Sequence, residues 1–336
     1  MPLPPFSPQF CHRSGALSFG LLILWMPFSG AFAVPLSQFM PDTPPPAVTT
    51  YKTVDTFPLT FAVFFPSDWK AQDKRPAVVF IHGGAWVAGN GRAFFPHARY
   101  FAARGAVAFS IEYRLEKPEG STMGNCLADC KSAVRYIRGH AGKLGIDPDK
   151  IAAFGDSAGG HLAAALGTCD GFDDAGDDVK ISSVPNAMVL CNPIVDLTEG
   201  AWIKYIIRGT AMAKGAKPGD MHPTAEQLSL ARALSPLGNI KPGQPPAVLM
   251  HGTADKVVNP QQARDFAAAY AKAGNRCDLD WMEGSGHAFV MTGYKAPEPV
   301  VVDAIRKADA FLGSLGWLVG PPTLEVSTPP AWQKRT

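Results

Sequence analysis

The sequence contains little of what marks nucleic-acid-binding or metal-dependent proteins. Its 31 Lys and Arg residues nearly balance its 29 Asp and Glu residues, the net charge is +2, and no Lys/Arg-rich run occurs. Binding to nucleic acid or to an anionic membrane surface is therefore not expected. The chain also lacks the C-x-x-C and H-E-x-x-H motifs. We expect neither a metal site nor a cofactor.

Cysteine is scarce, with six residues in a chain of 336, and Cys11 lies in the N-terminal segment. The other five are Cys126, Cys130, Cys169, Cys191 and Cys277. Because five is odd, at least one thiol must stay free or pair between chains. An oxidising compartment permits a disulfide without requiring one. Cys130 falls on the apolar face of a predicted helix, where it is expected to pack as a small buried hydrophobe.

Long apolar runs are confined to the N-terminus. Residues 16–28 are mostly apolar, follow His12 and Arg13, and lead to the triplet Ala-Phe-Ala at 31–33. A positive start, an apolar centre and an A-x-A cleavage site together predict a secretory signal peptide over residues 1–33.

The alternative is an uncleaved membrane anchor, which is less favoured because Pro27, Ser29 and Gly30 interrupt the apolar run before it reaches spanning length. No second run of membrane length follows. We therefore expect a mature protein that begins at Val34, is soluble, has no integral membrane contact and is secreted or periplasmic.

Proline and overall composition divide the rest of the chain. Five prolines within residues 34–50 predict an extended, structureless linker. A hydrophobic content of 46% over this length favours one large α/β domain, which we place at residues 51–318. Residues 196–240 form the only insertion long enough to be a lid. The proline-containing residues 319–336 predict an extended C-terminal tail.

Strand-like and helix-like patterns alternate through this domain. Two strand-like runs between residues 51 and 66 lead into a third at 76–81. Further strands are predicted at 106–111, 151–154, 186–191, 247–250 and 277–282, and helices at 95–104, 127–144, 158–167, 261–273 and 300–315. Such alternation predicts a mostly parallel central sheet with helices on both faces.

Five aspartates crowd into residues 169–180, after the third of these helices. Their spacing does not match an EF-hand loop, so a solvated acidic loop is favoured over a calcium site.

The pentapeptide G-D-S-A-G, from Gly155 to Gly159, lies between a predicted buried strand and a predicted helix. A G-x-S-x-G motif in this context is typical of a nucleophile elbow, in which a sharp turn exposes the serine. Small flanking residues allow neighbouring backbone to pass closely. We therefore predict that Ser157 is a nucleophile.

A serine nucleophile needs a base and an acid that orients the base. His287 ends a glycine-rich loop after the last predicted strand, and Asp255 follows the strand 247–250. The order serine, acid, histidine is that of α/β-hydrolases. Glu283 and Asp196 stay open as alternative acids. His161, on the helix after the nucleophile, is expected to be structural.

The loop after the third strand reads His-Gly-Gly-Ala-Trp over residues 82–86. Paired glycines let backbone amides face a substrate, so Gly83 and Gly84 are predicted to form an oxyanion hole with the amide of Ala158. Trp86, from this loop, and Trp202, from the lid insertion, are predicted to contact substrate, although a core-packing role for Trp86 is equally consistent with the sequence.

The motifs HGGAW, EYRL at 112–115, GDSAGGH, HGTAD and GSGHAF together resemble the acetyl esterase/lipase branch of the α/β-hydrolases, which is related to hormone-sensitive lipase. Within that branch the chain looks most similar to secreted bacterial acetylxylan/feruloyl esterases. The resemblance implies an α/β-hydrolase fold and hydrolysis of esters through an acyl-enzyme. Two positions depart from the family pattern: Ala85 replaces a third glycine, and Glu112 replaces an aspartate.

Three functions remain open. The leading hypothesis is a secreted serine carboxylesterase that acts on short acyl groups, either in small molecules or on polysaccharides. Its cleft is expected to be open because no helical cap precedes the first strands. A small-molecule carboxylesterase/lipase or an arylformamidase-like amidase is the enzymatic alternative. A hydrolase-like ligand-binding protein is the non-enzymatic one, and it is disfavoured because all three triad members are present.

Overall fold

The computed structural model describes residues 33–40, 45, 47–116, 121–198, 202–209 and 222–328. These residues belong to one compact unit, Phe32–Thr336. The predicted signal peptide lies outside the described residues, except for Ala33. Within the described part of the chain, no helix is both long and apolar enough to cross a membrane.

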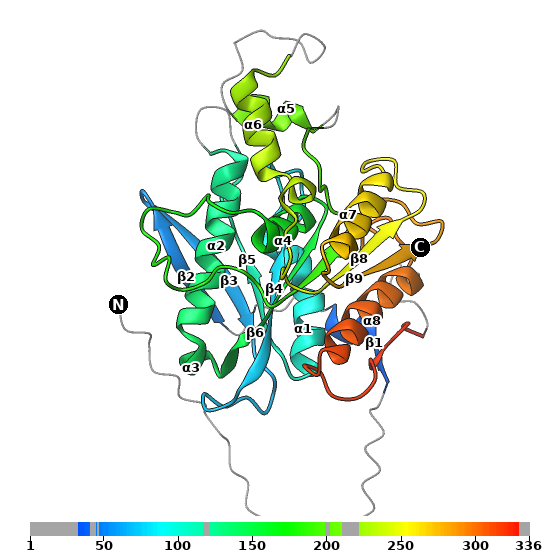
Figure 1. Ribbon diagram of the computed structural model, residues 1–336. Helices are drawn as coiled ribbons and strands as arrows, with labels where there is room; N and C mark the ends of the chain where they lie inside the picture. The colour runs from blue at the N-terminus through cyan, green and yellow to red at the C-terminus, as the bar shows by residue number, and fades with distance from the viewer. Residues whose placement is uncertain are drawn as a thin grey trace, which may run out of the picture. The chain divides into compact units, whose positions relative to one another are not determined.

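The centre of the fold is an eight-stranded sheet in the order β2-β3-β5-β4-β6-β7-β8-β9 (Figure 1). The strands are β2 Ala47–Val54, β3 Phe57–Phe64, β4 Arg75–Ile81, β5 Val107–Ile111, β6 Ile146–Asp156, β7 Ala187–Cys191, β8 Ala247–Gly252 and β9 Cys277–Met282. Strand β3 is antiparallel to both β2 and β5, and all other neighbours are parallel. The mostly parallel sheet predicted from the sequence is confirmed.

Helices cover both faces of this sheet. They are α1 Phe95–Ala103, α2 Met123–Gly139, α3 Ala141–Leu144, α4 Ala158–Thr168, α5 Ile203–Gly209, α6 Ala225–Leu234, α7 Gln261–Lys272 and α8 Glu298–Ser314. Side chains alternate across a strand, so each strand supplies two cores. In β4, Val79 and Ile81 join a cluster with α2, α4 and α7, whereas Val78 and Phe80 join a cluster with α1 and α8.

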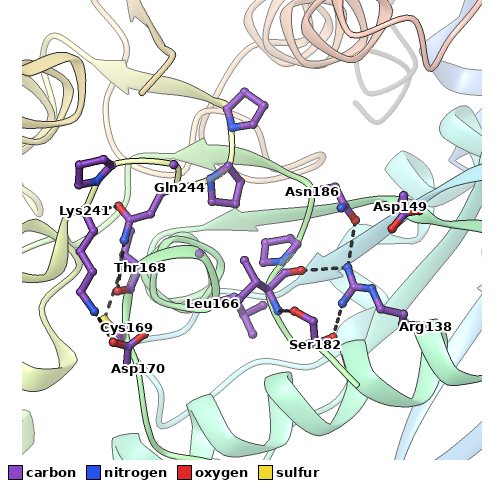
Figure 2. A pocket seen from close by; sticks show the side chains of 17 residues that line it. Arg138, Asp149, Leu166, Thr168, Cys169, Asp170, Ser182, Asn186, Lys241 and Gln244 are labelled. Carbon is purple, nitrogen blue, oxygen red and sulfur yellow. Dashed lines mark hydrogen bonds and ion pairs between the residues drawn. The ribbon is translucent and has the colours of Figure 1, made fainter. Parts of the chain in front are cut away.

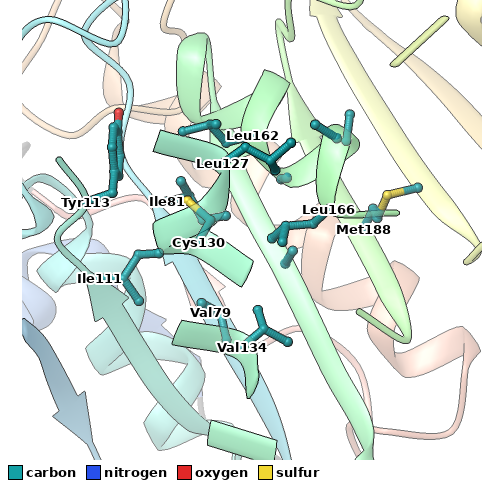
Figure 3. Packing of buried hydrophobic residues seen from close by; sticks show 14 of the residues in the cluster. Val79, Ile81, Ile111, Tyr113, Leu127, Cys130, Val134, Leu162, Leu166 and Met188 are labelled. Atoms are coloured by element: carbon teal, nitrogen blue, oxygen red, sulfur yellow. The ribbon is translucent and has the colours of Figure 1, made fainter. Parts of the chain in front are cut away.

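The first of these cores shows why the amphipathic pattern of α2 forms a helix here. Leu127, Cys130, Val134 and Ile137 recur every three or four residues and are all fully buried. Figure 3 shows three of them beside side chains from the sheet and from α4. Burial of Cys130 as an apolar side chain is thus confirmed. Fully burying one large aliphatic side chain stabilises a fold by about 1.5–3 kcal/mol, so this single face contributes substantially.

The prediction of a structureless linker over residues 34–50 is wrong. Val34 and Pro35 form β1, which pairs in parallel with β10, Leu324–Glu325. The 3₁₀ turn that follows, Leu36–Phe39, buries its two end residues, and β2 already begins at Ala47. Proline removes backbone donors but does not prevent apolar neighbours from packing. The predicted tail is correspondingly part of the fold as far as residue 328.

The acidic loop is held by cations rather than solvated along its length, which corrects the prediction for residues 169–180. Arg135 of α2 pairs with Asp173 at 2.5 Å and with Asp177 at 2.9 Å. Lys52 of β2 pairs with Asp174 at 2.5 Å. This network attaches the loop to the sheet and to α2.

The lid insertion, residues 196–240, supplies α5, α6 and the 3₁₀ turn Pro236–Asn239. Helices α5 and α6 contact one another, and α5 also contacts α2. Ile206 and Ile207 on α5 are buried. Residues 199–201 and 210–221 of the insertion lie outside the described residues.

Candidate active site

The turn between β6 and α4 has the geometry of a nucleophile elbow. Ser157 adopts φ 55° and ψ −119°, a conformation that costs a non-glycine residue about 1–3 kcal/mol. A side chain at Gly155 would collide with the backbone of Gly159, and one at Gly159 would collide with the backbone of Ile81. Both glycines are therefore required for the close packing that presents the serine hydroxyl.

The structure brings the three predicted triad residues into one hydrogen-bonded line. Ser157 Oγ lies 2.8 Å from His287 Nε2, and His287 Nδ1 lies 2.8 Å from Asp255 Oδ2. The carboxylate can only accept, so Nδ1 carries the proton and Nε2 accepts from the serine hydroxyl. This is the tautomer that a general base requires.

Asp255 is held firmly in its ionised form. Its Oδ1 accepts the amides of Val257 and Val258 at 2.8 and 3.0 Å, and its Oδ2 lies 3.4 Å from Nε2 of the buried His251. Burial raises the pKa of the Asp255 carboxyl, but hydrogen bonds from His251, His287 and the backbone outweigh it and hold that pKa well below its usual range. An ionised Asp255 is therefore available to stabilise a protonated His287.

The two alternative acids have other partners. Glu283 is exposed, and its Oε2 accepts the hydroxyl of Thr253 at 3.3 Å. Asp196 accepts the amide and hydroxyl of Thr198 at 2.8 and 2.6 Å, which makes a local turn at the start of the lid insertion. Among the three candidates, Asp255 alone is bonded to His287 in the described structure.

The loop after β4 lies against the nucleophile. A Cβ added to Gly83 would come within 2.9 Å of the Asp156 carbonyl oxygen and 3.3 Å of Ser157 Cβ, so this position tolerates no side chain. Ala158 is the first residue of α4, and the first four amides of a helix have no intrahelical acceptor. The amides of Gly83, Gly84 and Ala158 thus lie on backbone segments that meet around the serine.

The departure from the glycine-rich family pattern falls on a left-handed turn. Gly84, Ala85 and Trp86 have φ values of 113°, 53° and 61°. Left-handed backbone costs an L-residue roughly 1–2 kcal/mol relative to the right-handed region, a penalty that glycine avoids. The turn is stabilised by the Gly84 carbonyl, which accepts the amides of Val87 and Ala88 at 3.1 and 3.0 Å.

Trp86 and Trp202, both predicted to contact substrate, do not line the cavity at Ser157. Trp86 is fully buried, and its ring meets those of Trp202 and Tyr205 edge-on. Its Nε1 donates to Nδ1 of the buried His161 at 3.1 Å. Trp86 therefore has the core-packing role, and it anchors the glycine loop from behind.

A buried network beside the triad could not be recognised from motifs. Asn192 donates to Asp156 Oδ1 at 2.8 Å and accepts the amide of Ala288 at 3.2 Å. Burial raises the pKa of Asp156 to about 6, even though the charge of His287 and the Asn192 hydrogen bond lower it. The one available signal was position, because Asn192 directly follows β7, at the edge where parallel sheets place functional groups.

A cavity of about 550 Å³ opens over Ser157. Besides the triad serine and histidine and the glycine loop, its walls include Ala85, Ala93, Val257, Ala288, Met291 and Tyr294. This combination of an apolar wall with few convergent polar groups is typical of a small-molecule site.

A second cavity, of about 600 Å³, lies at the other edge of the sheet, where β7 and β8 begin (Figure 2). Its most prominent cation, Arg138, donates to the carbonyls of Pro148, Ser182 and Val184 and to Asn186 Oδ1. Most of its donors are thus used within the protein, so we assign Arg138 a structural role.

Comparison with known proteins places this geometry in a family. The BD-FAE family profile matches residues 63–270, more than half of the chain. The chain belongs to the BD-FAE family. Ser157 and Asp255 lie within the matched range, and His287 lies beyond it.

Several curated relatives are esterases by name. Esterase LipC of Mycobacterium tuberculosis is 30% identical over 241 residues, which cover 66% of this chain and 56% of LipC. The probable isoprenylcysteine alpha-carbonyl methylesterase ICMEL1 of Arabidopsis thaliana is 25% identical over 221 residues, which cover 63% of this chain and 45% of the relative. The chain spans about half the length of these curated relatives.

Solved structures match a larger share of this chain than these curated relatives do. Esterase 2 of Thermogutta terrifontis, phosphorylated by paraoxon, is 38% identical with a TM-score of 0.71, covering 82% of this chain and 95% of that one. The propionate-bound form of the same esterase is 37% identical with a TM-score of 0.73, covering 83% and 98%. This BD-FAE family protein therefore has the α/β-hydrolase fold and is similar to carboxylic ester hydrolases.

Proposed function

We propose that this protein is a secreted serine carboxylesterase whose catalytic triad is Ser157, His287 and Asp255. The observation that carries the proposal is the line of two 2.8 Å hydrogen bonds that joins the serine hydroxyl to the carboxylate through the imidazole. A ligand-binding protein would not need this proton path. The esterase names of the similar proteins support the same reaction type.

In the proposed reaction, Ser157 Oγ attacks the ester carbonyl carbon while its proton passes to His287 Nε2. The carbonyl oxygen becomes an oxyanion that accepts hydrogen bonds from the amides of Gly83, Gly84 and Ala158. Collapse of this intermediate breaks the bond to the alcohol oxygen, which takes the proton from His287. Water, deprotonated by His287, then attacks the acyl-enzyme. Collapse of this second intermediate breaks the bond to Ser157 Oγ, which takes the proton back from His287, and releases the carboxylic acid.

Short acyl groups fit the site best. The cavity at Ser157 is bounded by Ala93 and Met291 on its apolar side, and it does not extend behind the glycine loop, where Trp86 fills the space. The similar Thermogutta esterase has been solved with propionate and with butyrate bound. We propose acetyl-type esters, with the alcohol portion small or attached to a polysaccharide.

Export from the cytoplasm would favour a polymer substrate, since cell-wall polysaccharides such as xylan lie outside the cytoplasm. Strand β1 begins at Val34, the first residue after the predicted cleavage point, and the Val34 amine nitrogen remains able to donate to Thr323 O at 2.8 Å after cleavage. Expression of the full chain, followed by N-terminal sequencing of the exported protein, tests this step. A mature N-terminus at Val34 is expected, and retention of the intact chain in the cytoplasm would refute export.

The activity itself is tested by comparing kcat/KM for acetyl, butanoyl and octanoyl esters of p-nitrophenol, with acetate release from acetylated xylan measured alongside. We expect the acetyl or butanoyl ester to be preferred, and Ser157→Ala to lose several orders of magnitude in rate. A preference for octanoyl esters, with no acetate from any polymer, would contradict the short-acyl proposal. Faster turnover of a formanilide than of any ester would instead indicate an amidase.

A further inference from the structure

A third cavity, of about 560 Å³, adjoins the one at Ser157. Both cavities include Val257, His287 and Tyr294 among their lining residues, so they meet at the histidine. The third cavity lies between the loop that follows β8 and the loop that follows β9. It also includes Lys256 and Lys295.

The proposed reaction determines which part of an ester would enter this cavity. The carbonyl oxygen must face the amides of Gly83 and Gly84, whereas the alcohol oxygen must lie within reach of His287 Nε2, from which it takes a proton. The alcohol portion therefore extends toward the histidine side of the site. The cavity that the His287 loop itself lines is on this side.

Charge gives this cavity a chemical preference. Lys256 and Lys295 are exposed, and within the described residues neither ammonium group has a carboxylate within ion-pair distance. Lys295 lies 5.5 Å from the ring centroid of Tyr294, which is itself 59% exposed. Glu283 is the one exposed carboxylate on the same wall, so the two cations outnumber it.

We propose that the third cavity is a subsite for the alcohol portion of the ester, and that it favours an alcohol that carries a negatively charged group such as a carboxylate. Lys256 and Lys295 would attract that group, and the exposed ring of Tyr294 would pack against the body of the alcohol. This inference rests on the proposed esterase function. It narrows the substrate class from short-acyl esters in general to those of acidic alcohols, including uronate-bearing carbohydrates.

Two esters with the same acyl group test the proposal on the full mature protein. The anionic probe is 4-acetoxybenzoate, and the neutral probe is 4-acetoxybenzamide, which matches it in shape. At low ionic strength we expect kcat/KM for the anionic ester to exceed that for the neutral one by about three- to tenfold, because exposed ion pairs are individually weak. The ratio should fall as salt is added, since 0.1 M salt screens charges beyond about 10 Å.

Substitutions then test whether the two lysines cause the preference for the anionic ester. In the double variant Lys256→Gln/Lys295→Gln, the anionic-to-neutral ratio should fall to about one, and in Lys256→Glu/Lys295→Glu it should fall below one. Lys272→Gln is the matched control, because this exposed lysine ends α7 shortly before β9 begins, whereas the cavity lies beyond the ends of β8 and β9. The anionic-to-neutral ratio of this variant should equal that of the wild type. Equal unfolding midpoints confirm that the variants are folded.

The outcomes distinguish failure of the subsite proposal from failure of the esterase proposal. A wild-type ratio of one or less, or a ratio that the double glutamine variant leaves unchanged, would overturn the acidic-alcohol subsite while leaving the esterase intact. Hydrolysis of neither ester, with short-chain p-nitrophenyl esters also untouched, would overturn the esterase proposal and the subsite together.

Discussion

Trp86 donates a hydrogen bond from its indole Nε1 to Nδ1 of His161 at 3.1 Å, and both side chains are fully buried. His161 Nε2 in turn lies 2.8 Å from the carbonyl oxygen of Leu234, at the end of α6. Because Nδ1 accepts, Nε2 must carry the proton and donate. One imidazole thereby connects the glycine loop, the helix that follows the nucleophile and the lid insertion.

Replacing His161 by Ala should destabilise the fold more than it affects chemistry directly. The substitution leaves the Trp86 N–H and the Leu234 carbonyl buried without partners and opens a cavity, at a combined cost of about 3 kcal/mol. Urea unfolding measures this cost. The control is His222→Ala, at an exposed position, which should change the free energy of unfolding by less than about 0.5 kcal/mol. Equal effects would argue against the buried connection.

Gly83→Ala tests the contact between the glycine loop and the nucleophile. The new methyl group would press on the Asp156 carbonyl and on Ser157 Cβ, so the loop must move away from the serine. Loss of one aligned amide costs roughly 10²–10³ in kcat. Gly142→Ala in α3, where an added Cβ meets nothing within 4 Å, should leave kcat unchanged. A fully active Gly83→Ala enzyme would remove this loop from the oxyanion hole.

The acid of the triad can be identified by isosteric substitution. Asp255→Asn should lower turnover by about 10⁴, because an amide at this position disfavours the required tautomer of His287. Glu283→Gln is the matched control and should cost far less, since the Glu283 side chain contacts Thr253 instead. Steady-state kinetics on a short-chain ester provides the comparison. Reversed effects would show that Glu283 is the acid.

Buried neutral histidines make the free energy of unfolding fall as the pH is lowered. Burial lowers the pKa of His97 to about 4, although its hydrogen bond to the Val290 carbonyl opposes this. The unfolded chain, with a histidine pKa near 6.5, therefore binds a proton between pH 6.5 and 4 that the folded chain does not. The free energy of unfolding consequently falls with decreasing pH in this window, by at most about 1.4 kcal/mol per pH unit for this residue.

His97→Gln isolates that contribution. Asp156 changes the free energy of unfolding in the opposite direction, because burial raises its pKa to about 6. It is present in both proteins, so its contribution cancels when the unfolding free energies of wild type and variant are subtracted. The gap in unfolding free energy between wild type and variant should narrow as pH falls from 6.5 to 4. A gap independent of pH would mean that the pKa of His97 is the same in the folded protein as in the unfolded chain.

Local patterns predicted the strands and the residues that directly follow them. Ser157, Asp255 and His287 each follow a recognisable strand, and parallel strands bring such positions to one edge of the sheet. Features created by distant segments that carry no motif were missed. The pairing of β1 with β10 and the bond from the Ser37 amide to Ser327 Oγ join residues about 290 positions apart, so no local signal in the proline-rich segment indicates that it packs.

The burial of Trp86 could not be predicted from the sequence either. An indole suits both a pocket wall and a core, and the choice depends on whether its N–H finds a buried acceptor. For Trp86 that acceptor is His161, 75 residues away in the chain. The roles of Asn192 and of Tyr294 depend in the same way on loops that meet only in the folded protein.

The most direct test of the account is covalent labelling of the nucleophile. Incubation of the mature protein with paraoxon, which phosphorylates the similar Thermogutta esterase, should abolish esterase activity and add one diethylphosphoryl group per chain, located on Ser157 by peptide mass spectrometry. Ser157→Ala should take up none. Full activity after exposure to excess paraoxon, or a stoichiometric adduct on another residue that accompanies inactivation, would contradict Ser157 as the nucleophile.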